Sequence, residues 1–188
     1  MFSRLAAEGE CAERVSQTNK VVPLVPISRV VFACVVVATL DGAFAVVLYV
    51  YLLRLCSPAQ LMQSIAGALL GRAAFRGGRT TVALGLVLHC AVACGWTVVY
   101  AALRDRSAWL RQLTARTRGA LMAGALFGIL VWLAMDLLVV PLSRASATPL
   151  RSPLFAILLA WHAVGVGIPL ALIVREPSRR GSPLAVHA

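Results

Sequence analysis

The chain has 188 residues, of which 60% are hydrophobic and only 13% are charged, a composition too apolar for a soluble domain of this length. Its formal net charge of +11 would suit nucleic acid, but the cations avoid four long apolar stretches and crowd the segments between them. That spacing is typical of anchors for lipid headgroups, so we expect a lipid bilayer and no nucleic acid as partner. Five cysteines without metal-finger spacing argue against a disulfide framework and a metal site.

The two ends of the sequence predict tails. Residues 1–28 are polar, mixed in charge and interrupted by Pro23 and Pro26, which predicts a disordered cytoplasmic tail. The apolar run that follows is too long, and starts too late in the chain, for a signal peptide. Residues 176–188 predict a second disordered tail, so one folded transmembrane domain is expected over residues 29–175.

Four apolar runs reach the length of about 20 residues that a helix needs to cross about 30 Å of hydrocarbon. Within lipid, such a run can satisfy its backbone hydrogen bonds only internally, and the alternating pattern of a barrel strand is absent. The sequence therefore predicts an all-α membrane protein, a bundle of four transmembrane helices. The predicted spans are 30–53, 80–103, 119–142 and 153–174.

Two shorter helices are expected between the spans. Ser57, Pro58 and Gln60 have the pattern of a helix start: a capping serine, a proline at the first helical position and a capping-box glutamine. The helix predicted over 58–75 is too short to span, so it should lie in the membrane interface or re-enter the edge of the bundle. The arginine-rich segment 104–118 predicts a short helix lying on the surface.

The distribution of cations predicts an orientation. We call face A the side of both termini and of residues 104–118, and face B the opposite side. Twelve of the 18 Lys and Arg residues fall on face A and six on face B. Because cytoplasmic segments retain cations, both termini are expected in the cytoplasm. The bias towards Arg, Ala and Gly is typical of a GC-rich bacterial genome, so the membrane should be the bacterial cytoplasmic (inner) membrane.

Each predicted span carries one ionisable residue: Asp41, His89, Asp136 and His162. At 1.5 Å per residue, Asp41, His89 and His162 lie about 17 to 21 Å from face A, and Asp136 lies about 26 Å from it. An aspartate at the centre of a span costs about 3 kcal/mol on the insertion scale. All four side chains are therefore expected to point into the bundle as a polar cluster.

Small residues predict where the helices touch. Ala120, Gly124, Gly128, Trp132 and Asp136 form one stripe at a spacing of four residues, which would let a neighbouring helix approach closely. The other glycines expected at helix contacts are Gly67, Gly71, Gly85 and Gly165.

Three functions fit the polar cluster. It could pass protons or a small cation across the membrane, as intramembrane Asp and His do in transporters. It could instead hold helices together in a structural or accessory subunit that binds a membrane-protein partner or a second copy of the chain. His89 and His162 could also be the axial ligands of a haem, although Asp41 would crowd it. No catalytic motif occurs, so no enzyme activity is expected.

The stretches Leu40-Asp41-Gly42, Gln63 to Gly71 and Leu88-His89 resemble a family of small bacterial inner-membrane proteins described only as hypothetical transmembrane proteins. The resemblance covers about residues 30–174 and departs from the family pattern where Gly67-Ala68 replaces a Ser-Gly pair. It implies four spans in a bacterial inner membrane. It implies no activity, substrate or cofactor.

Overall fold

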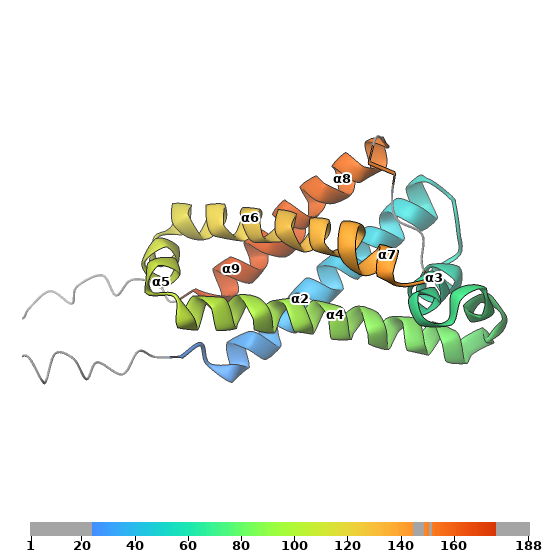
Figure 1. The fold of residues 1–188 in the computed structure, drawn as a ribbon, viewed down its shortest axis with the longest axis horizontal. Helices are drawn as coiled ribbons and strands as arrows, with labels where there is room; N and C mark the ends of the chain where they lie inside the picture. Colours follow the sequence, from blue (N-terminus) through green and yellow to red (C-terminus); the bar gives the residue numbers. More distant parts are fainter. Residues whose placement is uncertain (1–23, 145–148, 151, 176–188) are drawn as a thin grey trace, which may run out of the picture.

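The structure, a computed structural model, describes residues 24–144, 149–150 and 152–175. Every regular element in these ranges is a helix, and four helical segments are long and apolar enough to cross a membrane. Successive segments run in opposite directions along the bundle (Figure 1). The four predicted helices are confirmed, and they are consistent with a multi-pass membrane protein. The segments are Ile27–Leu52, Gly78–Arg106, Thr117–Leu142 and Pro153–Val174.

The first, third and fourth spans change from α-helix to the wider π-helix part-way along, whereas the second is α-helical throughout. The first two spans consist of α2 (Ile27–Ala45), a π segment (Val46–Leu52) and α4 (Gly78–Arg106). The third consists of α6 (Thr117–Ala134), a π segment (Met135–Val139) and α7 (Val140–Leu142). The fourth consists of α8 (Pro153–Trp161), a π segment (His162–Gly167) and α9 (Ile168–Val174).

Two of the three π segments end just before a proline. Pro141 follows Met135–Val139, and Pro169 follows His162–Gly167. A proline has no backbone N–H to donate, and its ring crowds the carbonyl four residues earlier, so the turn before it cannot keep regular α-helical hydrogen bonds. A widened turn is one way for the chain to accommodate this loss.

The helix between the first two spans begins where the sequence predicts. Ser57 Oγ accepts a hydrogen bond from the Gln60 backbone at 3.2 Å, and Gln60 Oε1 accepts one from the Ser57 backbone at 2.8 Å. The helix, α3, covers Pro58–Leu70 and so ends before the predicted position 75. Gly71, with a φ of +58°, terminates it, and a 3₁₀ segment continues over Gly71–Arg76.

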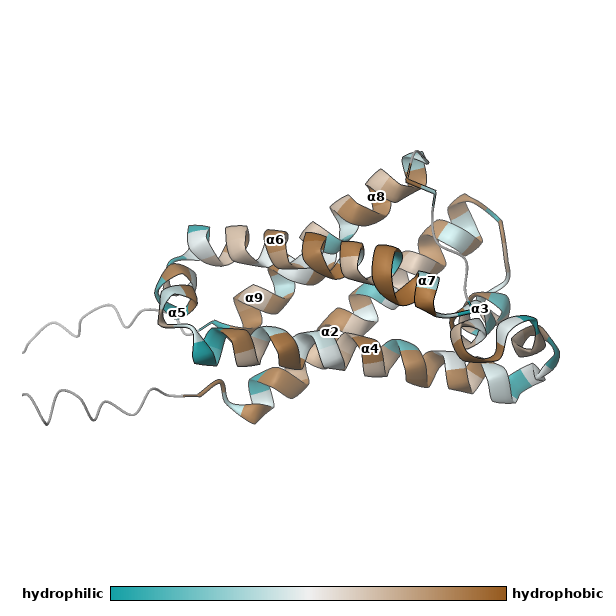
Figure 2. Cartoon of the chain, viewed as in Figure 1, coloured by the Kyte–Doolittle hydropathy of each residue, from teal (hydrophilic) through white to brown (hydrophobic). Residues whose placement is uncertain are grey.

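Apolar side chains cover the outside of the bundle between two polar ends. The short helix α5 (Ala108–Ala115) joins α4 to α6 at face A. Hydrophilic residues gather near α5 and at the turn between α3 and α4, and apolar residues predominate between them (Figure 2). Large side chains there are exposed, including Val31 at 56%, Val87 at 63% and Leu126 at 65%. Exposure on this scale suits helices whose neighbours are lipid chains rather than water.

The glycine stripe of α6 lies against the fourth span. A Cβ atom at Gly128 would overlap the carbonyl of His162, and one at Gly124 would lie 2.5 Å from the carbonyl oxygen of Gly167. A Cβ at Gly85 would likewise overlap the carbonyl of Met62, so α4 touches the backbone of α3. Because these three positions have no side chain, the helix backbones come into direct contact there.

The other glycines expected at helix contacts have different surroundings. A Cβ built at Gly67 would meet no atom within 4 Å among the described residues, and Gly71 terminates α3 next to the side chain of Arg144. Gly165 faces the indole of Trp161 from its own helix rather than a neighbouring helix. The spacing of small residues did not distinguish a contact from a helix terminator.

Replacing Gly128 with alanine should destabilise the bundle, because the added methyl group would overlap backbone that cannot move without separating two spans. Gly128→Ala should lower the thermal unfolding midpoint in mild detergent, with an overpacking cost of about 1–3 kcal/mol. Gly95→Ala is the control, because a Cβ there would meet no described atom within 4 Å. Equal midpoints for the two variants would contradict the backbone contact.

Candidate functional site

The structure brings the four ionisable residues of the spans around one pocket of about 710 Å³. Asp41 comes from α2 and His89 from α4, whereas Asp136 and His162 come from the π segments of the third and fourth spans. Each span therefore contributes one of these side chains to the pocket. Two of the four lie where the helix is widened, a local structure that is frequent at functional sites.

Asp41 is the centre of the polar contacts in this pocket. Its Oδ1 lies 3.9 Å from His162 Nε2 and accepts a hydrogen bond from Trp161 Nε1 at 3.2 Å. The side chains are partly shielded, with 27% of Asp41 and 13% of His162 exposed. Trp161 also stacks on Phe44, with ring centroids 4.0 Å apart, so the donor to Asp41 is held in place by α2 itself.

The second nitrogen of His162 fixes which atom faces Asp41. Nδ1 lies 2.8 Å from the carbonyl oxygen of Leu158. A carbonyl oxygen can only accept, so Nδ1 carries the hydrogen and, in the neutral ring, Nε2 presents a lone pair to Asp41. A carboxylate and an unprotonated ring nitrogen are both acceptors. If the pair takes up one proton, the two facing acceptors become either an ion pair, with the proton on His162, or a neutral pair, with the proton on Asp41.

His89 links the second span to the first. Its Nε2 lies 2.9 Å from the carbonyl oxygen of Ala38 and must donate to it, which leaves Nδ1 as the acceptor in the neutral ring. The ring lies against Gly42, where a Cβ would be 3.2 Å from Nε2. The glycine next to Asp41 thus provides the space in which the imidazole lies.

Asp136 and Trp132 complete the pocket from the third span. Asp136 is only 4% exposed and lines the pocket one helical turn beyond Trp132. The Trp132 ring lies next to the His162 ring, with centroids 4.8 Å apart. The third span therefore supplies a second carboxyl group and an aromatic wall to the site.

Trp161 and Gly42 were not among the site residues predicted from the sequence. The signal for Trp161 was its indole N–H, a donor that needs an acceptor inside an apolar span, directly before a histidine already singled out. The signal for Gly42 was its position beside Asp41. Neither signal identifies the partner, because the partner lies on another helix.

Coordination of a haem through the Nε2 atoms of His89 and His162 does not suit the polar contacts of the pocket. Coordination through both Nε2 atoms would break the bond from His89 to Ala38 and place the iron beside the Asp41 carboxyl group. That setting is polar where the macrocycle needs apolar walls. Within residues 24–144, 149–150 and 152–175, no three His, Cys, Asp or Glu side chains come together as a metal site.

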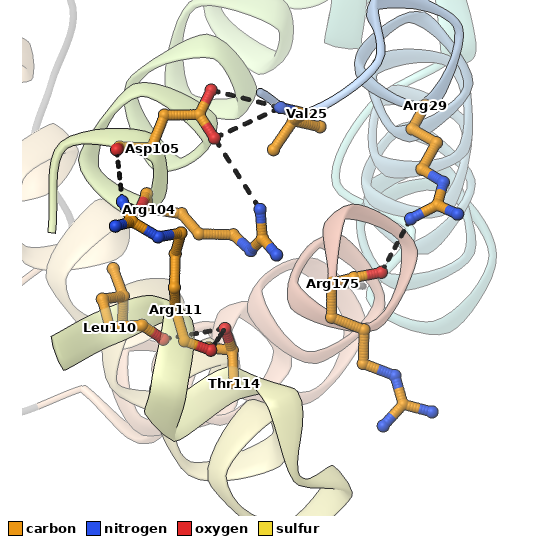
Figure 3. Close-up of polar contacts among 8 residues, drawn as sticks. All are labelled: Val25, Arg29, Arg104, Asp105, Leu110, Arg111, Thr114 and Arg175. Atoms are coloured by element: carbon orange, nitrogen blue, oxygen red, sulfur yellow. Dashed lines mark hydrogen bonds and ion pairs between the residues drawn. The ribbon is translucent and has the colours of Figure 1, made fainter. Parts of the chain in front are cut away.

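Face A is closed by a network of polar contacts (Figure 3). The Asp105 carboxylate accepts the backbone N–H of Val25 at 3.2 and 3.3 Å and lies 3.7 Å from Nη1 of Arg104, which is 3% exposed. Arg29 donates to the carbonyl of Arg175 at 3.0 Å, past the end of α9. These contacts join the ends of the first, second and fourth spans.

The lining of the pocket extends from exposed residues at face B to the buried apolar core of the bundle. Its lining continues beyond the first span to Leu55 and Gln60, which are exposed. On the face A side of Asp41, the spans meet in a buried cluster that includes Ala33 and Val174, both at 0% exposure. The polar residues therefore lie between an exposed rim at face B and a buried apolar core towards face A.

No family model, curated protein or solved structure matches this chain. The resemblance to small bacterial inner-membrane proteins therefore remains confined to its short motifs. Three residues of those motifs, Asp41, Gly42 and His89, lie together at the pocket. A fourth, Gln63, is buried and donates at 3.3 Å to Thr81 Oγ1, which attaches α3 to α4.

Access to the pocket predicts a difference between two cysteine variants in a cysteine-free background. Asp41→Cys should react readily with a cationic, water-soluble thiosulfonate, because the pocket reaches this position from face B. Ala33→Cys should resist the same reagent, because its side chain lies in the buried core. Mass spectrometry of the protein in nanodiscs gives both rates. Equal reactivity would show that the core is not sealed.

Proposed function

We propose that the chain is a multi-pass membrane protein whose Asp41–His162 pair binds a proton or a small cation inside the bundle. The observation that supports this function is the approach of Asp41 Oδ1 to His162 Nε2, 3.9 Å apart in the pocket. His162 Nδ1 already donates its hydrogen to the carbonyl of Leu158. A proton shared between Asp41 and His162 Nε2 must therefore come from outside the pair. Aspartate and histidine at membrane depth mark proton and ion sites in transporters. We propose binding and passage rather than catalysis, because the sequence contains no catalytic motif.

The bound ion would exchange with face B in the conformation described. Passage to face A requires the packed half of the bundle to open while the pocket closes, which is the alternating access of transporters. The π segments are where we propose that the spans bend, because their hydrogen-bond ladders are already interrupted. Two of these segments carry Asp136 and His162, so bending would also move the site.

We further propose that the protein lies in a bacterial cytoplasmic membrane with both termini in the cytoplasm. The excess of cations on face A supports this orientation. We place α3 in the interface at face B, because its capped start at Ser57 is exposed and Leu61 and Ile65 line the pocket. In that position α3 would border the entrance rather than cross the membrane.

Asp41→Asn and His162→Ala should each reduce proton or monovalent-cation flux in liposomes by at least about tenfold, because each removes one partner of the shielded pair that we propose holds the ion. A pH-sensitive dye inside the liposomes, with an imposed pH or cation gradient, measures the flux. Cys90→Ser is the control, because this exposed side chain of the second span lies outside the pocket lining. Wild-type liposomes no leakier than empty ones would contradict the proposed function.

A structural subunit is the second candidate. The polar contacts of the site join the first span to two others, since His89 bonds to Ala38 and Trp161 bonds to Asp41. Such bonds would serve as helix-packing contacts in an accessory subunit as well. Asp41→Asn would then lower the unfolding midpoint and leave the flux through liposomes unchanged. The glycines Gly124 and Gly128 are already covered by the fourth span and are not free for a partner.

Reporter fusions test the orientation. Green fluorescent protein fused after Ala188 should fluoresce, because it folds in the cytoplasm. Alkaline phosphatase fused after Arg144 should be active, because it needs the opposite side of the membrane. The reverse result for both fusions would invert the proposed topology without affecting the site.

A further inference from the structure

The pocket around the Asp41–His162 pair is much larger than a proton or a bare cation needs. Its volume of about 710 Å³ compares with about 30 Å³ for one water molecule in the liquid. Pockets of about 300 to 1,000 Å³ are typical of sites for organic molecules. The proposed function specifies that the site binds a positive charge. The size of the pocket indicates which kind of molecule could carry that charge.

The charges around the pocket select a cation. Two carboxyl side chains, Asp41 and Asp136, line it together with two imidazoles, and no Lys or Arg is among the described residues that line it. The arginines that the structure describes all lie outside this lining, although the chain as a whole is strongly positive. A negative charge in an apolar surrounding attracts a cation more strongly than it would in water.

Aromatic rings make up much of the remaining wall. Trp132 lies beside His162, and Trp96 packs edge-on against Phe127, with centroids 6.2 Å apart. The faces of such rings attract cations, and their area favours apolar substituents. A hydrated metal ion would gain nothing from these walls. The aromatic residues in the lining are Phe44, Tyr49, Phe75, Trp96, Phe127 and Trp132.

From size, charge and lining together, we infer that the pocket binds an amphipathic organic cation. Its positive centre lies at Asp41 and its apolar body lies along the aromatic wall. The ligand enters at face B, past Leu55 and Gln60. The inference rests on the proposed function, because a proton and an organic cation would use the same carboxylate.

Binding of tetraphenylphosphonium, a lipophilic cation, tests the inference. Equilibrium dialysis against the purified full-length protein in nanodiscs should show saturable binding, and Asp41→Asn should weaken it by at least about tenfold. Cys90→Ser should bind like the wild type. Tetraphenylborate has the same shape and the opposite charge, so it should show no saturable binding above that of empty nanodiscs.

A second measurement needs no variant. Cys56 lines the pocket, so tetraphenylphosphonium should slow its reaction with a maleimide, and tetraphenylborate should not. Equal effects of the two ions, or an unchanged dissociation constant in Asp41→Asn, would overturn the inference. If the cation fails to bind while flux still depends on Asp41, the ligand class is wrong and the proposed function survives. If the flux is absent as well, both are wrong.

Discussion

An ionisable side chain at hydrocarbon depth must meet a partner or water, and this requirement arranges the four spans. Asp41 meets Trp161 and His162, and His89 meets the carbonyl of Ala38. Each of these contacts joins the first span to another span. The third and fourth spans instead meet through backbone contact at Gly124 and its neighbours. Polar contacts thus add to apolar packing in holding the first span in place, and close backbone packing joins the third and fourth spans.

The two ends of the bundle differ in how tightly the spans pack. At face A, the bonds from Val25 to Asp105 and from Arg29 to Arg175 join the helix ends above an apolar core that includes Ala33 and Val174. Towards face B, the spans enclose the pocket instead of filling the space with side chains. A four-helix protein of this size can therefore combine a well-packed end with a polar pocket, because one half of each helix forms the packed core and the other half lines the pocket.

Sequence patterns predicted the local features and not the pairings. Hydropathy gave the spans, and the capping box at Ser57 gave the start of α3, because both depend on residues that are close in sequence. Counting residues placed Asp41, His89 and His162 at similar depths, but depth does not determine rotation about the helix axis. That Asp41 faces His162, with His89 bonded to a backbone carbonyl, therefore required the structure. The three π segments also went unpredicted, because hydropathy is insensitive to helix type.

The π segments make the length of a span matter as much as its composition. A π turn accommodates one more residue than an α turn, and one residue corresponds to a rotation of about 100° around the helix axis. Deleting a residue from Met135–Val139 or His162–Gly167 would leave the span apolar and long enough to cross a bilayer. The part of the helix on the far side of the deletion would nevertheless turn away from its present neighbours. In an alignment of homologous chains, a one-residue gap within either π segment would indicate a site with different contacts. A hydropathy plot would not reveal this difference.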